Sequence, residues 1–163
     1  MEIRNMLKKD WEMVSQIYKE GIDTQFATFE TQVPSYLDWD VAHLRVGRLV
    51  MEEEKKVLGW AALSPVSSRC VYRGVAEVSV YVGQNFRGLG IGKSLIQQLI
   101  LESETAEIWT LQSGIFSENL GSITLHEKMD FRYLGKKERI GKLHGEWKDN
   151  LLFERRSKVV GVN

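Results

Sequence analysis

The stretch AEVSVYVGQNFRGLGIGKS, residues Ala76–Ser94, constrains the fold more than any other part of the chain. Its opening run, AEVSVYV, alternates apolar and other side chains, which is the pattern of a strand with one buried face. A glycine-rich loop follows, and the apolar residues after it have helical spacing. A helix that begins directly after glycines exposes free backbone N–H groups and the positive end of its dipole. The stretch therefore predicts an anion site, most often one for phosphate.

The spacing of the glycines separates three kinds of phosphate loop. A P-loop would need glycine at position 87, where the chain has Arg87, and a Rossmann loop would need glycine at position 93, where it has Lys93. The pattern [Q/R]-x-x-G-x-[G/A] is met by Arg87, Gly90 and Gly92, and it resembles the acetyl-CoA pyrophosphate loop of the GNAT superfamily of N-acetyltransferases. The alternative is a turn without a ligand, but three glycines cost more chain entropy than one tight turn requires.

Composition excludes several other classes of protein. Lys plus Arg and Asp plus Glu both number 22, and this balance argues against a non-specific nucleic-acid binder and does not oppose self-association. One cysteine allows no intrachain disulfide, and His43, His126 and His144 lack metal-ligand spacing. No apolar run has the length of a membrane helix, and the charged N-terminus is unlike a signal peptide. We expect a cytoplasmic protein with no metal, no nucleic-acid partner and no membrane partner.

The remaining patterns predict one α/β domain over residues 1–163. Gly21 is expected to end the first helix, Ser117 to cap the fourth, and residues 157–163 to be frayed. Residues 22–32 have no clean period, and a functional loop and a plain surface loop are equally compatible with them. The expected strands are 2–7, 48–53, 56–64, 76–82, 107–115, 132–142 and 146–156, and the expected helices are 11–20, 35–46, 92–105 and 118–129.

This order of elements is the one expected of the GNAT superfamily, and the resemblance covers nearly the whole chain. It implies a mostly antiparallel central sheet flanked by helices, with acetyl-CoA as co-substrate. A second region, from Asn119 to Phe131, resembles the family's next motif, although His126 stands where many members have the tyrosine that protonates the leaving thiolate. The cofactor-binding residues implied by both regions are Val80, Tyr81, Val82, Arg87, Gly88, Leu89, Gly90, Ile91, Gly92, Lys93, Asn119, Ser122 and Lys128.

Several short runs, in order along the chain, resemble the phosphinothricin N-acetyltransferase-like enzymes of this superfamily. That resemblance implies acetylation of the amino group of a small amino-acid analogue, such as phosphinothricin or methionine sulfoximine or sulfone. It also implies a homodimer and a role in antibiotic or herbicide resistance. The runs are DTQFATFE (23–30), PSYLDW (34–39), Tyr72 with EVSVYV (77–82), RGLG (87–90), LHE (125–127) and HGEWKD (144–149).

Transfer to an amine needs a group that accepts its proton, because an α-ammonium is mostly protonated at neutral pH. Glu77 is the best candidate, since it leaves the strand beside the cofactor loop on the side away from the apolar row, where burial would raise its pKa. The resemblance assigns the matching glutamate to catalysis, which favours a base acting through a water. It also makes His144 a second acid–base or orienting residue. The alternatives are a carboxylate that only holds a cation and a solvated histidine at a hairpin tip.

An acidic amino-acid analogue needs cationic groups, and Arg69 and Arg73, with Tyr72 and Tyr81, lie on or just before the central strand. Solvent-exposed charges are the competing interpretation of the arginines, above all of Arg73. We expect the rest of the acceptor wall to come from Thr28, Phe29 and Glu30, although Phe29 could instead pack into the core. Two other functions remain open at this point: a GNAT enzyme acting on a polyamine or a protein amine, and a non-catalytic acetyl-CoA-binding module.

Overall fold

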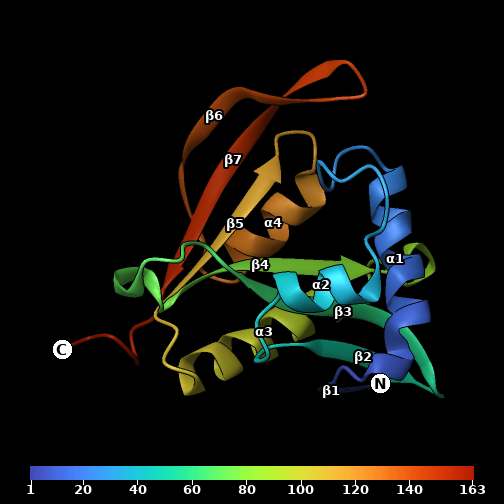
Figure 1. Ribbon diagram of the computed structural model, residues 1–163, viewed down its shortest axis with the longest axis horizontal. Coiled ribbons are helices and arrows are strands. Elements are labelled where there is room, and N and C mark those ends of the chain that lie inside the picture. The colour runs from blue at the N-terminus through green and yellow to red at the C-terminus, as the bar shows by residue number, and fades with distance from the viewer.

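The computed structural model describes all of residues 1–163 and contains a seven-stranded sheet flanked by four α-helices (Figure 1). The strands are β1 (Glu2–Asn5), β2 (Leu49–Glu53), β3 (Lys56–Pro65), β4 (Val75–Val82), β5 (Thr110–Phe116), β6 (Arg132–Leu143) and β7 (Glu146–Arg156). The helices are α1 (Trp11–Asp23), α2 (Tyr36–Ala42), α3 (Ile91–Thr105) and α4 (Leu120–Lys128). The element order predicted from the sequence is confirmed.

The strands lie in the order β1-β2-β3-β4-β5-β7-β6, and every neighbouring pair is antiparallel except β4 and β5. The mixed, mostly antiparallel sheet expected from the family resemblance is therefore present. The turn between β2 and β3 has positive φ angles at Glu54 and Lys55, as a two-residue hairpin loop of matching twist requires. His144 and Gly145 form a second turn of this kind between β6 and β7.

The two faces of the sheet pack against different helices because β3 is apolar on both sides. Ala61 and Leu63 belong to the larger core, which they form with α3, whereas Trp60 and Ala62 belong to a smaller core formed with α1 and α2. Both cores bury side chains almost completely. The sheet is thus covered by α3 and α4 on one face and by α1 and α2 on part of the other.

The parallel neighbours β4 and β5 pair only at one end. Val75–Glu77 pair with Thr110–Gln112, after which the two strands diverge (Figure 1). The Gly83 N–H donates to the Leu58 carbonyl at 2.9 Å, and ladder bonds alternate along an antiparallel pair. The N–H groups of Val80 and Val82 therefore point away from β3 and into the gap that the divergence opens.

Three expected helix boundaries were wrong. Helix α2 ends at Ala42 and not at residue 46, because His43 is extended and the Leu44 N–H donates to the Leu63 carbonyl of β3 at 2.8 Å. Helix α1 continues through Gly21 to Asp23, and the glycine makes room for the ring of Tyr81, since a Cβ there would lie 2.6 Å from Tyr81 Cε1. Helix α4 begins at Leu120 and is capped by Asn119, whose Oδ1 accepts from the Ser122 N–H at 3.2 Å, and Ser117 is not its cap. In each place a tertiary contact or a stronger cap overrides the local signal.

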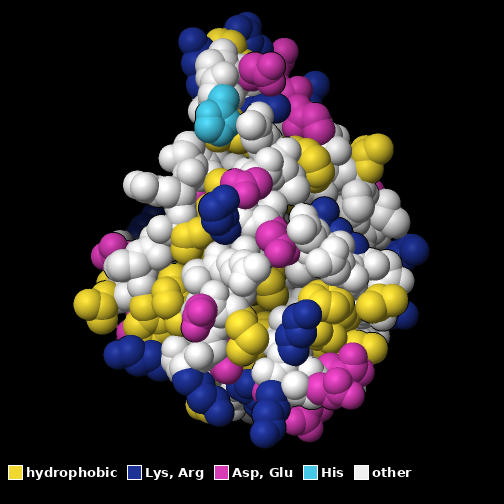
Figure 2. Space-filling view, turned by 90° about the vertical axis from the view of Figure 1, so that its right-hand side faces the viewer, with side chains coloured by type: hydrophobic (Ala, Val, Ile, Leu, Met, Phe, Trp, Pro, Cys, Tyr) yellow, Lys and Arg dark blue, Asp and Glu magenta, His cyan; other side chains and the backbone are white.

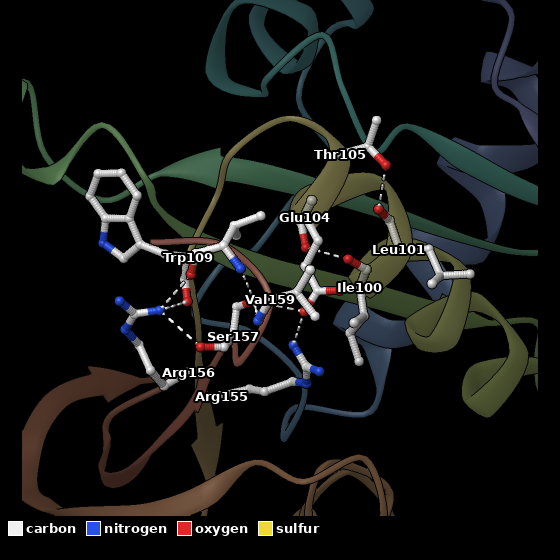
Figure 3. Close-up of polar contacts among 11 residues, drawn as sticks. Ile100, Leu101, Glu104, Thr105, Trp109, Arg155, Arg156, Ser157 and Val159 are labelled. Carbon is white, nitrogen blue, oxygen red and sulfur yellow. Dashed lines mark hydrogen bonds and ion pairs between the residues drawn. The ribbon is translucent and has the colours of Figure 1, made fainter. Parts of the chain in front are cut away.

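The C-terminal segment is anchored, contrary to the frayed tail expected for residues 157–163. Ser157 is buried, and its hydroxyl donates to Glu104 Oε1 at 2.8 Å and accepts from the N–H of Val159 at 3.0 Å (Figure 3). Arg155 also donates to Glu104, at 3.2 Å, and Arg156 donates to the carbonyl of Trp109 at 3.3 Å. These contacts tie the tail to α3 and to the segment before β5.

No helix of the chain has the length and apolar character needed to cross a lipid bilayer.

Candidate active site

The gap between β4 and β5 opens into a cavity of about 1250 Å³. The cavity is lined on one side by the loop before α3 and by α4, and on the other by α1 and the loop that follows it. Pockets for drug-sized ligands commonly measure about 300–1,000 Å³, so this one has room for a long ligand and a small second molecule. We call the part next to α3 and α4 the cofactor end and the part around Glu77 the acceptor end.

The cofactor end is built largely from backbone. Gly88 and Gly90 have φ of +79° and +80°, and a Cβ at either position would meet no atom within 4 Å, so the backbone is open to a ligand. Gly90 is the N-cap of α3, whose first N–H groups are free of intrahelical partners. Arg87 and Lys93 line the same end and form no ion pair within the protein. This combination is an anion site of the predicted kind.

The third glycine of the loop has a different task. A Cβ on Gly92 would lie 3.0 Å from Leu125 Cδ2, so Gly92 allows α3 to approach α4. Asn119, which caps α4, and Ser122 and Lys128 within α4 line the cavity. The β4 residues Val80, Tyr81 and Val82 also line it. The one expected cofactor residue that does not line it is Leu89, whose side chain points from the loop into solvent.

His126 is a core residue of α4. It is 1% exposed, its ring packs edge-on against Phe131, and Nδ1 donates to the Ser122 carbonyl at 2.7 Å. That bond leaves Nε2 as the unprotonated nitrogen, and Nε2 is buried without a partner. Burial lowers the pKa of His126. The ring is therefore neutral at neutral pH, with a lone pair rather than a proton on its free nitrogen.

Glu77 lies on the floor of the acceptor end. It is paired in register with Gln112 across the last rung between β4 and β5, so its carboxylate lies where the strands begin to diverge. The carboxylate makes no hydrogen bond or ion pair with the protein. Enclosure by the cavity walls raises the pKa of Glu77, and the positive charge of Lys137 opposes that rise. A carboxylate of raised pKa that is free of partners is suited to accept a proton.

Aromatic side chains form the wall beside Glu77. Tyr81 stacks on Trp60 with ring centroids 4.9 Å apart, and Tyr18 lies 5.0 Å from Tyr81. Burial raises the pKa of both tyrosines, which keeps their phenols neutral. The charge of Glu30 raises both values further, so Glu30 lies near this wall.

The loop after α1 is held over the acceptor end. Phe29 packs edge-on against Phe116 of β5 at 4.6 Å, and a Cβ on Gly141 of β6 would lie 3.0 Å from the Phe29 ring. Thr28, Phe29 and Glu30 all line the cavity. Phe26 and Phe29 stay partly exposed and do not enter the core, so the loop lies along the cavity wall.

Four residues expected at the acceptor do not line the cavity of this chain. His144 lies at the turn between β6 and β7, and Figure 2 shows that hairpin projecting at the top of the molecule with charged side chains gathered at its end. Arg69 lies over the ring of Tyr72 at 5.6 Å, and Arg73 lies over Trp109 at 5.6 Å. Their roles at the acceptor stay predictions that this cavity does not support.

The structure adds residues that sequence reasoning missed. Lys137 of β6, Asn150 of β7 and Phe116 of β5 face each other across neighbouring strands and all line the cavity. These residues could be found only from the pairing register of the last three strands, and that register cannot be read from the sequence.

Comparisons with known proteins agree with this geometry. Residues 3–131 match the family model described as the acetyltransferase (GNAT) family. The L-methionine sulfoximine/L-methionine sulfone acetyltransferase of Salmonella typhimurium is 30% identical over 91% of this chain and 90% of its own length. The phosphinothricin N-acetyltransferase of Streptomyces viridochromogenes is 30% identical over 91% of this chain and 84% of its own length.

A solved structure shows the same architecture with a ligand. The phosphinothricin acetyltransferase of Sinorhizobium meliloti, in complex with acetyl-CoA, superimposes with a TM-score of 0.89 at 26% identity and covers 99% of this chain and 91% of that one.

Proposed function

The chain belongs to the acetyltransferase (GNAT) family and is an N-acetyltransferase, and we propose that it acetylates the amino group of a small amino-acid-like molecule. The observation that carries the proposal is the continuous cavity through the gap between β4 and β5, with an anion site at one end and Glu77 at the other. The relatives named for phosphinothricin and methionine sulfone support an acceptor of this class.

The residues of the cofactor end fit acetyl-CoA. Free N–H groups at the start of α3, together with Arg87 and Lys93, would hold the pyrophosphate, and the open backbone at Gly88 and Gly90 permits its close approach. The N–H groups of Val80 and Val82 point into the gap, where they can bind carbonyl oxygens of a ligand lying along β4. Bound acetyl-CoA supplies the acetyl group as a thioester.

Glu77 acts as the general base. An α-ammonium cannot attack a carbonyl until it loses a proton, and Glu77 offers a carboxylate of raised pKa with no protein partner at the acceptor end. Its raised pKa makes proton transfer from the ammonium less unfavourable, and the open cavity admits a bridging water. Thr28, Phe29, Glu30 and Tyr81 close the space around the amine and hold it near the gap.

Four expectations from the sequence remain proposals. They are the single domain over residues 1–163, the homodimer, the cytoplasmic location and the role in antibiotic or herbicide resistance. One sheet that includes all seven strands supports the first.

The test is release of the free thiol from acetyl-CoA with several acceptors assayed in parallel. Methionine sulfone, methionine sulfoximine and phosphinothricin are expected to support turnover, whereas spermidine and a peptide amine are not. Turnover with spermidine or the peptide alone would keep the family and replace the acceptor class. Absence of turnover with every amine, despite acetyl-CoA binding, would favour the non-catalytic binding module.

A further inference from the structure

The acceptor end contains one basic residue that nothing so far assigns. Four Lys and Arg side chains line the cavity, and three of them, Arg87, Lys93 and Lys128, belong to the cofactor end. The fourth is Lys137 on β6, on the side of Glu77. The acceptor end therefore contains both signs of charge, which suits a molecule that is itself a zwitterion.

The charge of Lys137 is free for a ligand. Its neighbour Lys136 lies 3.9 Å from Asp149 Oδ2, and Lys148 on the adjacent strand lies 3.7 Å from Glu118 Oε1. Lys137 forms no ion pair of this kind. It is nevertheless close enough to Glu77 for its charge to lower the pKa of that carboxyl. Two opposite charges thus share a cavity without neutralising each other.

The register of the sheet explains this arrangement. Lys137 lies opposite Asn150, and Asn150 lies opposite Phe116, so all three share one face of the sheet. Glu77 is on the same face, opposite Gln112, four positions before Phe116 on β5. The two backbone positions differ by four residues along the strands, roughly 13 Å, and by three strand spacings, roughly 14 Å, across the sheet. Both side chains are long and line the same cavity, and the charge of Lys137 acts on Glu77 across the space between them.

We propose that Lys137 is an acceptor-specificity residue, which binds the carboxylate of an amino acid whose amino group faces Glu77. This inference rests on the proposed function. A lysine is a compact charge on a flexible stem, so it can follow carboxylates of slightly different position, as a site for several amino-acid analogues requires. Lys137 takes the place that the sequence suggested for Arg69 and Arg73, which lie outside the cavity.

The test compares an amino acid with its uncharged amide. Wild type, Lys137→Met, Lys137→Arg and Lys136→Met are assayed with methionine sulfone and with methionine sulfone carboxamide, at a pH well above the acidic limb of the profile so that Glu77 is ionised throughout. Lys136→Met is the matched control, because Lys136 is the adjacent residue on the opposite face of β6 and is paired with Asp149.

We expect Lys137→Met to raise the KM for methionine sulfone by about tenfold, the effect of losing one charge-assisted contact in an open site. The KM values for the carboxamide and for acetyl-CoA should not change, Lys137→Arg should retain most of the preference for the acid, and Lys136→Met should behave as wild type.

Three outcomes overturn the inference, and they differ in what they say of the proposed function. An unchanged preference for the acid in Lys137→Met removes Lys137 from recognition while leaving the function in place. Turnover of the carboxamide alone by the wild type does the same. If the wild type acetylates neither compound, the proposed function fails and the inference fails with it.

Discussion

The two ends of the cavity are built in different ways. The cofactor end is formed by one nearly continuous segment, from Val80 to Lys93, together with α4, and much of it is backbone. The acceptor end is formed by side chains from α1, the following loop, β4, β5, β6 and β7. One end depends on local conformation, whereas the other depends on the register and curvature of a whole sheet.

The difference also concerns charge. Arg87, Lys93 and Lys128, together with free N–H groups, make the cofactor end mainly positive, which fits a polyanion, whereas Glu77, Glu30 and Lys137 give the acceptor end both signs of charge. A polyanion site tolerates variation in side chains because the backbone carries much of the binding. A site for a small zwitterion depends on each side chain. Substitutions at the two ends should therefore act on different kinetic constants.

The largest expected effect is that of Glu77→Gln. Loss of a general base costs about 10²–10⁴-fold in rate, so we expect kcat with methionine sulfone to fall by about that factor while the KM for acetyl-CoA stays unchanged. Steady-state kinetics with each substrate varied in turn measures both constants. A kcat within twofold of wild type would exclude Glu77 as the base.

The control for this variant is its stability. Partial enclosure by the cavity raises the pKa of Glu77, although its side chain keeps contact with solvent, so its contribution to stability is small, fully present below the unfolded pKa and lost as pH rises through the folded pKa. The ionised carboxylate therefore disfavours the fold at neutral pH. Glutamine removes that penalty, and the unfolding midpoint at pH 7 should equal or exceed that of wild type. A lower midpoint would mean that the loss of activity reflects misfolding.

The next prediction distinguishes a loss of acetyl-CoA binding at the cofactor end from a general loss of stability caused by backbone strain. Gly90→Ala forces a side chain into φ of +80°, and Gly145→Ala does the same at +81° in the hairpin turn, with open space at both positions. Each should lose about 1–2 kcal/mol of stability. Only Gly90→Ala should raise the KM for acetyl-CoA, by about tenfold, because its methyl group occupies the space a phosphate would approach. Equal KM values in the two variants would place the pyrophosphate elsewhere.

The same contrast explains what could be predicted from the sequence. The family and the anion loop followed from Arg87, Gly90 and Gly92, since a loop that binds through its backbone needs particular residues at fixed spacing. The element order followed from hydrophobic periodicity, and the alternation in β4 placed Glu77 on the side away from the apolar row. These inferences depend on residues that are close together in the chain, and such local patterns can be read directly from the sequence.

The residues that were missed depend on pairing between distant strands. Lys137 reaches the cavity because β6 lies beside β7 and β7 beside β5, an order that inverts the sequence order of the last two strands. The boundary at Gly21 was wrong for a related reason, since many helices end at a glycine, and here the glycine lies inside the helix and makes room for the ring of Tyr81. The frayed tail was wrong because Glu104, far away in sequence, binds Ser157.

Gly21 provides a third and smaller test, in which substitution of glycine by alanine changes the free energy of unfolding in opposite directions at the two ends of the cavity. In Gly21→Ala the new methyl group would lie 2.6 Å from the Tyr81 ring, and such overpacking costs about 1–3 kcal/mol. Gly121→Ala, in α4 at the cofactor end, meets no atom within 4 Å and should gain up to about 1 kcal/mol from helix propensity. Urea unfolding measures both. A stabilised Gly21→Ala would mean that Tyr81 moves aside freely, and that the aromatic wall of the acceptor end is not rigid.

The smallest effect is a shift in the pH profile, and it links Lys137 to Glu77 without reference to the acceptor's carboxylate. Catalysis needs ionised Glu77, so kcat/KM should rise with pH through the raised pKa of that carboxyl. The charge of Lys137 lowers this pKa, so Lys137→Met should move the acidic limb to higher pH with the carboxamide as acceptor, and Lys136→Met should not.

Added salt should narrow the difference in the position of the acidic limb between Lys137→Met and wild type, because ions enter an open cavity and screen the two charges. A limb that stays in place at low salt would mean that Lys137 does not act on Glu77, and the acceptor end would then lack the paired charges that distinguish it from the cofactor end.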